Sequence, residues 1–483
     1  MNSRSILLIN ANRMRPPVAP LALDYVGDHL YTAGFEVHLL DLCFAENPVD
    51  SIRHKLANFD PLAVGISFRN TDDCYLFSQA WFVPQLAELV TLVRSLTAAP
   101  IILGGCGFSI FPAPIMDYVQ ADFGVVGDGE ETMRRLMSAL RDDRDYRKIA
   151  GLAWRDATGR VVVNPPCYTS TLDIPPSRGM LDNLRYLHEG AMSNIETKRG
   201  CPMPCIYCAD PAAKGTALRV RDPRQVADEL ETLLARGIDV FHICDGEFNI
   251  PAEHALAVCE AIRDCGLGER IRWYAYASIQ PFSAELAEAM RRAGCVGINF
   301  GADSGCDRML AALRRGYRSA DIRQTVEHCR RAGITVMLDL LLGGPGEDEA
   351  SIRETIELIK SVDPDRAGAA TGLRVYPGTA LAELVRQQGP MPRNRNLHGC
   401  VEDNDNLLRP IFFIEQQLGD DPFGLIVDLI DGDERFFPPS RKQDAANYNY
   451  NDNKVLENAI AAGARGAFWD ILRKLADSSP RTS

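Results

Sequence analysis

Both the fold and the chemistry are indicated by one stretch, Lys198-Arg199-Gly200-Cys201-Pro202-Met203-Pro204-Cys205-Ile206-Tyr207-Cys208. Its cysteines are spaced C-x3-C-x2-C and directly follow an expected strand at residues 195–197. Three thiolates on one compact loop can bind three irons of a four-iron cluster and leave the fourth iron open, whereas closed clusters usually take four cysteines. The alternatives are three unligated thiols or a zinc site. Zinc usually shows a fourth Cys or His at matching spacing, and no histidine lies between residues 193 and 241.

The region around this loop, residues 191–386, alternates between apolar runs and amphipathic stretches. We expect strands at residues 195–197, 240–244, 271–277, 297–300, 335–342 and 369–375, with helices at 223–236, 252–265, 284–293, 319–332 and 349–361. Six β/α units of this length predict a (β/α)6 barrel, partial or complete, with its chemistry on the loops at the carboxyl ends of the strands.

The preceding residues, 1–145, show the same alternation and predict a flavodoxin-like, Rossmann-type α/β domain. Strands are expected at residues 5–10, 36–42, 62–68, 100–105 and 122–126, with helices at 21–33, 77–96 and 130–140. Residues 146–190 are expected to form a linker with one small hairpin. Residues 387–483 are expected to form a mostly helical C-terminal lid or packing domain, including a helix at 454–476.

Composition limits the class of protein. The 483 residues suggest about three domains. The net charge of −13 argues against a nucleic-acid or anionic-membrane surface, and no apolar run approaches the length of a membrane span. Most of the 14 cysteines are scattered singly, as small buried hydrophobes are, in a chain that we expect to be cytoplasmic.

The cysteine loop and the segments downstream of it resemble the radical SAM superfamily. Tyr207, before the last cysteine, matches the superfamily's aromatic position, so the resemblance assigns Cys201, Cys205 and Cys208 to a 4Fe-4S cluster that binds S-adenosylmethionine. The resemblance implies reductive cleavage of the sulfonium to a 5′-deoxyadenosyl radical, inside a barrel that excludes side reactions. It also implies an electron donor such as flavodoxin or ferredoxin.

Two further segments carry the resemblance. Asp245-Gly246-Glu247 stands where the superfamily has Gly-Gly-Glu, whose backbone holds the methionine amino group. Here Asp245 replaces the first glycine. Gly301-Ala302-Asp303-Ser304-Gly305 is similar to the superfamily's Gly-Val-Glu-Ser-Gly stretch, so Asp303 and Ser304 become candidates for the ribose site.

A flavodoxin-like domain before such a barrel resembles the cobalamin-binding class of radical SAM enzymes, many of which are class B methyltransferases. The loop at residues 10–17 lacks the histidine of the D-x-H-x-x-G signature, which implies cobalamin bound base-off and His-off. Ser67-Phe68-Arg69 stands at the family's Ser-x-Leu position, followed by Asn70; the paired glycines and the following loop supply Gly104, Gly105 and Gly127. A domain that has lost the cofactor is the alternative.

Arg69 replaces the leucine of that motif. An arginine at a strand end is usually solvated or paired, and Asp72 and Asp73 are available partners. The sharper hypothesis places Arg69 or Asn70 against the lower face of the corrin without ligating cobalt, which would leave cobalt(I) strongly nucleophilic.

We weighed three functions. The first is a cobalamin-dependent radical SAM methyltransferase that acts on an unactivated carbon of a small substrate, as in specialised biosynthesis. The second is a radical rearrangement, cyclisation or other non-methylating reaction, with cobalamin absent or not a methyl carrier. The third is a cobalamin or iron–sulfur sensor, which would need an output module such as a DNA-binding domain, and the chain shows none.

Candidate substrate residues come from the barrel strands and the tail. Tyr274 and Tyr276 alternate with Trp273, so both tyrosines face one side, where core packing is the default and substrate contact the alternative. Glu247 is a candidate for acting on substrate or cosubstrate. His242 fits a hydrogen-bonded core residue better than a base, and Tyr448 and Tyr450 are candidates to line the C-terminal lid.

Overall fold

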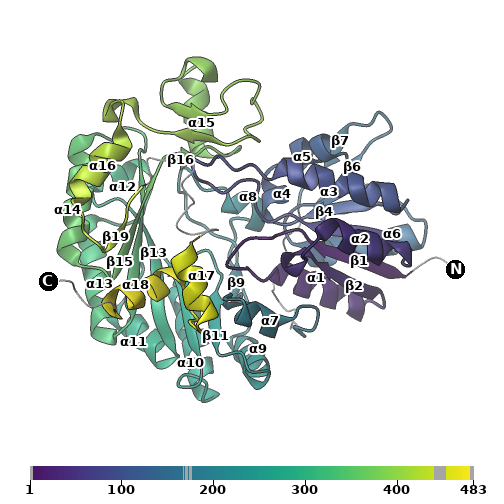
Figure 1. Cartoon of the computed structure of the whole chain (residues 1–483), viewed down its shortest axis with the longest axis horizontal. Coiled ribbons are helices and arrows are strands. Elements are labelled where there is room, and N and C mark those ends of the chain that lie inside the picture. Colours follow the sequence, from purple (N-terminus) through teal and green to yellow (C-terminus); the bar gives the residue numbers. More distant parts are fainter. Residues whose placement is uncertain (1–3, 167, 169–171, 173–176, 440–452, 479–483) are drawn as a thin grey trace.

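The computed structural model describes residues 4–166, 168, 172, 177–439 and 453–478. Two α/β lobes lie side by side, the N-terminal domain at the right of Figure 1 and the barrel half at the left. Within the described residues, no helix has both the length and the apolar character needed to cross a membrane. The candidates Tyr448 and Tyr450 lie outside the described residues.

The N-terminal sheet has the strand order β2-β1-β3-β4-β5 in parallel, which is the flavodoxin-like arrangement expected from the sequence. Its strands are β1 (Ser5–Asn10), β2 (Glu36–Asp41), β3 (Ala63–Ser67), β4 (Ile101–Gly104) and β5 (Phe123–Val125). The carboxyl ends of these strands meet at one edge, where this architecture binds its ligands.

Helices cover both faces of this sheet. They are α1 (Leu21–Thr32), α2 (Pro48–Ala57), α3 (Val83–Leu96), α4 (Cys106–Ile110), α5 (Pro112–Val119) and α6 (Gly129–Arg141). Side chains of α1 and α6 pack on Ile6 and Leu8 of β1, and α3 and α5 cover the other face. The helix expected at residues 77–96 begins only at Val83, where Pro84 suits the first turn.

The hairpin is part of this sheet, which corrects the expected linker. Strands β6 (Leu152–Arg155) and β7 (Val161–Val163) add to β5 in antiparallel order, so the sheet has seven strands. The sequence showed the turn, but it did not show which edge the hairpin would join.

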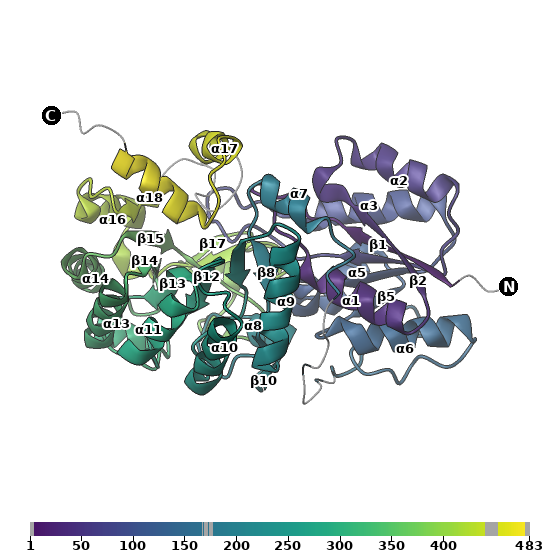
Figure 2. The ribbon, with the colours of Figure 1, turned by 90° about the horizontal axis from the view of Figure 1, so that it is seen from below.

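The second sheet is an open barrel, with the strand order β19-β15-β14-β13-β12-β11-β8 in parallel. Its strands are β8 (Ser193–Ile195), β11 (Val240–Ile243), β12 (Arg272–Ala277), β13 (Cys295–Asp303), β14 (Thr335–Leu342), β15 (Arg366–Thr371) and β19 (Phe436–Phe437). Figure 2 shows the outer helices along one side of these strands: α9 (Pro223–Ala235), α10 (Ala252–Asp264), α11 (Ala284–Arg292), α13 (Ser319–Ala332) and α14 (Glu349–Val362). The six expected strands are present, and the seventh, β19, comes from the C-terminal region.

The C-terminal region is mixed rather than mostly helical. Its strands β17 (Leu397–Gly399) and β18 (Ile411–Phe413) form the antiparallel sheet β16-β18-β17 with β16 (Leu373–Arg374) of the barrel region, and its first α-helix, α16 (Pro422–Ile430), follows them. The helix α15 (Ala380–Gln387) joins the two regions. The helix expected at 454–476 is two helices, α17 (Lys454–Ala461) and α18 (Phe468–Ser478). Gly463 and Gly466 between them have positive φ of 99° and 137°, which end the first helix. Figure 2 shows α18 across the strands from the outer helices.

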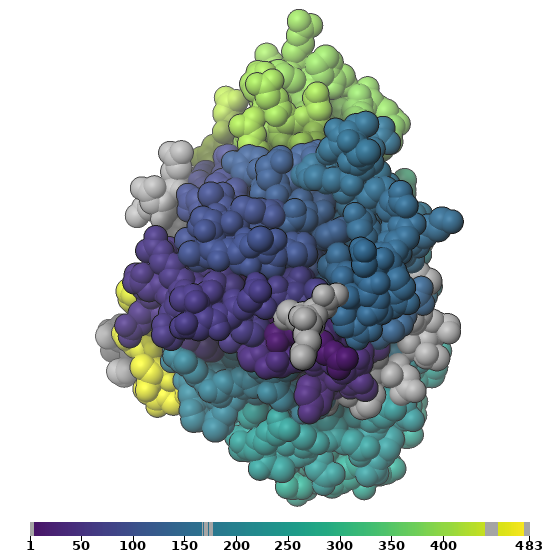
Figure 3. Space-filling model, turned by 90° about the vertical axis from the view of Figure 1, so that its right-hand side faces the viewer, coloured from purple at the N-terminus to yellow at the C-terminus, as the bar shows by residue number. Residues whose placement is uncertain are grey.

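One hydrophobic cluster spans the two lobes. Leu103 and Phe108 of the N-terminal domain belong to the same buried cluster as Leu313 and Leu373 of the barrel half, and Ile206 of the cysteine loop joins them. Figure 3 shows the N-terminal domain, in purple to blue, against the rest of the chain. This apolar contact orients the carboxyl edge of one sheet toward the other.

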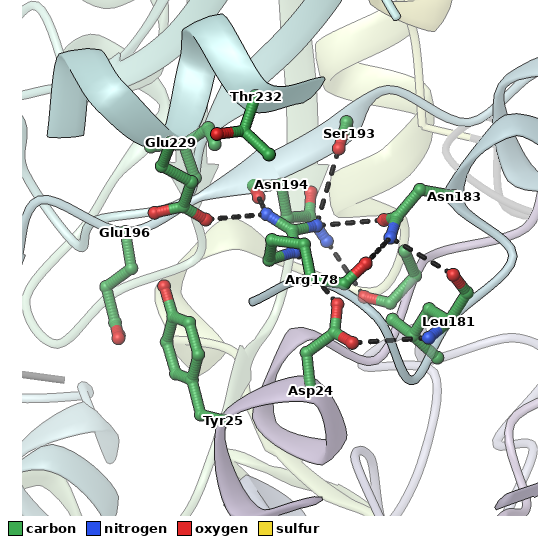
Figure 4. Close-up of polar contacts among 12 residues, drawn as sticks. Asp24, Tyr25, Arg178, Leu181, Asn183, Ser193, Asn194, Glu196, Glu229 and Thr232 are labelled. Atoms are coloured by element: carbon green, nitrogen blue, oxygen red, sulfur yellow. Dashed lines mark hydrogen bonds and ion pairs between the residues drawn. The ribbon is translucent and has the colours of Figure 1, made fainter. Parts of the chain in front are cut away.

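A buried arginine fixes the same junction on its polar side (Figure 4). The fully buried Arg178 pairs with Asp24 of α1 at 2.8 Å and with Glu229 of α9 at 2.7 Å. It also donates to the Asn194 carbonyl at 2.9 Å and to the Asn183 side chain at 2.9 Å. One guanidinium therefore connects both lobes and the segment between them.

Candidate active site

The cysteine loop has no regular structure and is held at both ends. It lies between β9 (Lys198–Arg199) and α8 (Asp210–Lys214). Gly200 has a φ of +86°, and a Cβ there would lie 2.1 Å from the Ala217 carbonyl oxygen, so only glycine fits. The Cys201 N–H donates to the Gly215 carbonyl, and the Ile206 N–H to that of Leu313. The three thiols themselves remain partly exposed.

Arg315 is the cation beside this loop. Its Nη1 lies 2.9 Å from the Cys205 Sγ, and its guanidinium pairs with Asp303 at 3.3 Å and Glu247 at 3.9 Å. Burial raises the pKa of the Cys205 thiol, and the neighbouring Arg315 charge opposes that rise. Arg315 follows α12 (Asp307–Ala312) in sequence. Arg315 was not among the residues predicted from the sequence, because only its place in the basic pair Arg314-Arg315 distinguishes it.

The donor set fits a cluster. In the described part of the chain, no three Cys, His, Asp or Glu side chains gather as ligands of one metal ion. A single zinc ion needs such convergence, whereas the cysteines of a four-iron cluster each bind a separate iron. Partly exposed thiols on one glycine-anchored loop, with a cation beside them, therefore suit a cluster better than a single ion.

Three predicted residues form a network with Arg315. The Tyr207 hydroxyl donates to Asp303 Oδ2 at 2.5 Å, and Asp303 has a left-handed φ of 57° next to a register shift in β13. Burial raises the pKa of Asp303, and it raises the pKa of Glu247 to about 7. Carboxylates beside a cation can accept hydrogen bonds from both hydroxyl and amino donors.

The side chains of two other predicted residues support the scaffold. Asp245 is buried and accepts from the Thr197 N–H at 2.8 Å and the Thr197 hydroxyl at 2.5 Å, which ties the end of β11 to the end of β8. The Ser304 hydroxyl is fully buried and lies 2.9 Å from that of Thr355 on α14. The structure brings neither side chain into the site. At Gly246 a Cβ would have space, with only Asp210 near it at 3.5 Å.

The predicted residues of the N-terminal domain gather at its carboxyl edge. Gly105 has a φ of +104°, and a Cβ there would lie 2.6 Å from the Phe68 carbonyl oxygen. The loop after β3, which carries Arg69, packs backbone to backbone on the turn after β4, since the Gly107 N–H donates to the Arg69 carbonyl at 2.8 Å. At Gly104, by contrast, the nearest atom to a Cβ would be 4.0 Å away, so a flat ligand can approach that backbone.

The remaining members of that edge have separate places. Ser67 ends β3, and Asn70 lies 3.9 Å from the Met14 sulfur. Gly127, with a φ of +81°, faces the Tyr168 ring, 3.1 Å from where its Cβ would be. All of these residues lie at the carboxyl edge of the sheet, together with Gly104 and the Arg69 loop. The edge therefore suits a large planar cofactor.

The barrel wall opposite this edge is aromatic. The rings of His242 on β11 and Tyr276 on β12 meet edge to face, with centroids 5.0 Å apart. Burial and the nearby Arg69 charge lower the pKa of His242 to about 4, so this histidine is neutral near pH 7. Tyr276 is 45% exposed.

Tyr274, unlike Tyr276, is not accessible to solvent. It is buried, and its hydroxyl donates to Asp470 of α18 at 2.7 Å. The two tyrosines face one side of β12 as predicted, but the C-terminal helix covers Tyr274 and leaves Tyr276 accessible. The structure therefore brings only one of this pair into the site.

Side chains of both lobes meet beside the carboxyl edge of the N-terminal sheet. Cys74 and Cys106 of the N-terminal domain are accessible, yet burial raises the pKa of both thiols, to about 12 at Cys74. Cys74 lies 3.0 Å from the Tyr376 hydroxyl of the barrel half, so the two lobes are in contact here.

The fold and this site define a radical SAM enzyme with a cobalamin-type N-terminal domain. Residues 195–359 match the Radical SAM superfamily, and residues 8–137 match the B12 binding domain. The chain is 30% identical to tryptophan 2-C-methyltransferase of Streptomyces laurentii, over 96% of this chain and 95% of that protein. The chain belongs to the family of cobalamin-dependent radical SAM methyltransferases.

Solved structures agree with this assignment. The radical S-adenosylmethionine methyltransferase TsrM of Kitasatospora setae, solved with tryptophan and a SAM analogue (aza-SAM), superposes with a TM-score of 0.91 at 30% identity, covering 98% of this chain and all of that one. Its structure with cobalamin and a [4Fe-4S] cluster superposes with a TM-score of 0.89 at 29% identity, covering 98% of each chain. The methyltransferase hypothesis is confirmed at the level of the family.

Proposed function

We propose that this enzyme methylates a carbon atom of a small aromatic acceptor of the tryptophan type. The carrying observation is the His242–Tyr276 wall, an aromatic pair with an accessible tyrosine that lies near enough to Arg69 for the arginine charge to lower the pKa of His242. Tryptophan is the substrate named for the relatives that match nearly the whole chain. Aromatic side chains that meet a ligand edge to face favour an aromatic ligand.

Each cofactor has a place in this proposal. The cluster with S-adenosylmethionine supplies radical chemistry, and cobalamin supplies a methyl carrier. Cys201, Cys205 and Cys208 would hold the cluster. Glu247, Asp303, Tyr207 and the backbone around Gly246 would hold the cosubstrate, with Arg315 as their common cation. A flavodoxin or ferredoxin would be the one-electron donor to the cluster.

Arg69 would lie against the lower face of base-off, His-off cobalamin. No histidine stands in the loop at residues 10–17, and the Arg69 guanidinium lies 3.6 Å from the Met14 sulfur of that loop. A guanidinium remains protonated and does not ligate a metal. The Arg69 guanidinium would therefore lie at the lower face of the corrin without coordinating the cobalt.

The test is anaerobic reconstitution with iron, sulfide and hydroxocobalamin, followed by turnover of tryptophan and S-adenosylmethionine. We expect one cluster and one cobalt per chain, and a product heavier than tryptophan by one methylene group. The Cys205→Ala variant should lose the cluster and the product while retaining cobalamin. Cobalt absent from the wild-type enzyme, or a product isomeric with its substrate, would refute the proposal.

A further inference from the structure

Two hydrogen-bond acceptors on the inner wall of the barrel have no role in the site described so far. Asn299 of β13 is the register partner of Tyr276, and Asp339 of β14 is the register partner of Gly301, two residues further along β13. Residues two apart on a strand point to the same face. Asn299 and Asp339 therefore continue the His242–Tyr276 wall across the next two strands.

Asp339 lacks a cation. Its carboxylate accepts a hydrogen bond from the Asn299 side chain, and among the described residues it forms no ion pair. Burial raises the pKa of Asp339 to about 7, and the Asp303 charge contributes to that rise. A carboxylate in a strand otherwise made of apolar residues and a threonine is costly unless a donor satisfies it.

Asn299 leaves a second acceptor free. Because a carboxylate only accepts, the amide nitrogen of Asn299 must be the group that faces Asp339. Its Oδ1 is buried without a hydrogen-bond partner, in a residue that is only 8% exposed. An unpaired buried acceptor costs about 1–3 kcal/mol. This unpaired amide oxygen, beside a carboxylate without an ion pair, indicates a ligand that brings donors.

We propose that Asp339 and Asn299 bind the protonated amino group of the substrate, while its ring lies against Tyr276 and His242. This inference rests on the proposed aromatic acceptor and adds that the acceptor is a primary amine, such as an α-amino acid. An ammonium group carries three donors and a positive charge, which suits one carboxylate and one carbonyl oxygen. A ring N–H has one donor and no charge, so it would leave Asp339 without a counterion.

The test measures equilibrium binding of L-tryptophan, tryptamine and indole-3-propionate to the reconstituted holoenzyme. We expect the wild type to bind the two amines at least about tenfold more tightly than the desamino acid. The Asp339→Asn variant should weaken both amines by about 10- to 100-fold and leave indole-3-propionate unchanged. Asn299→Leu, which removes the free acceptor, should shift the same two ligands in the same direction. Asp264→Asn, at an exposed position beyond the wall, is the matched control.

The outcomes separate this inference from the proposed function. Equal binding of all three ligands by the wild type, or equal weakening of all three by Asp339→Asn, overturns the amine site while methylation of an aromatic acceptor still stands. If the wild type binds none of the three, the aromatic acceptor is wrong and the amine site falls with it. Selective loss of the amines in either variant supports the inference.

Discussion

Arg178 holds the two lobes together, and its removal would leave a buried carboxylate without a cation. The substitution Arg178→Met keeps an unbranched apolar stem and removes the guanidinium donors. The Asp24 and Glu229 side chains are only 1% and 2% exposed. Glu229 would keep Arg221 at 2.7 Å, whereas Asp24 would keep only backbone N–H donors.

The magnitude follows from that asymmetry. Removing one partner of a buried ion pair costs about 3–5 kcal/mol. We expect about 3 kcal/mol, because Asp24 can take up a proton. Burial already raises the Asp24 pKa and Arg178 opposes the rise, so the pKa climbs further in the variant. An acid whose pKa is raised on folding binds a proton on folding, so the variant's deficit should shrink as the pH falls from about 8 to about 5.

The assay is urea unfolding of the apoprotein at several pH values, followed by circular dichroism and tryptophan fluorescence. Arg224→Met is the matched control, since Arg224 pairs with Asp228 on the same helix α9 at 63% and 55% exposure, and we expect a loss below about 0.5 kcal/mol. Adding Asp24→Asn to Arg178→Met should recover part of the loss. A deficit below about 1 kcal/mol, or one that grows as the pH falls, would refute the reasoning.

Three further substitutions test other parts of the structure. Arg69→Ala should change the electron paramagnetic resonance signal of bound cobalt(II) and slow turnover; no change in either means that Arg69 does not meet the corrin. Tyr274→Phe removes the hydrogen bond to the buried Asp470 and should cost about 1.5–3 kcal/mol, seen as a lower Tm, whereas an unchanged Tm would show the contact to be unimportant. Gly105→Ala forces a Cβ against the Phe68 carbonyl and should abolish cobalamin retention at unchanged iron content, and full cobalt occupancy would contradict this.

Local signals in the sequence predicted most of the fold. Apolar runs predicted the five parallel strands of the first sheet and six strands of the second, because buried parallel strands are continuously apolar. The hairpin at β6 and β7 was predicted as a unit, but its pairing with β5 depends on an edge that is distant in sequence. The prediction of one long C-terminal helix was wrong, because glycines with positive φ separate two shorter helices.

Site residues that belong to a local sequence motif could be predicted, whereas those that are brought together from distant parts of the sequence could not. The cysteine loop and the glycines of the first sheet are local patterns. Arg315 and Arg178 act through partners from several elements, which spacing does not reveal. Tyr274 and Tyr276 have the same periodicity, and only the position of α18 distinguishes them. Asp339 could have been noticed in the sequence, because it is the single acidic residue of a strand otherwise made of apolar residues and a threonine.

The core cluster that joins Leu103 and Phe108 to Leu313 and Leu373 has a practical consequence for anyone who wishes to dissect the enzyme. If the cobalamin-type half were expressed alone, its side of this hydrophobic cluster would be exposed to solvent, and exposed hydrophobic patches cause aggregation. Exchanging that half with a relative's would also misalign the anchored Ile206, and with it the cysteine loop. Chimeric enzymes in this family should therefore be cut inside a lobe rather than at the junction.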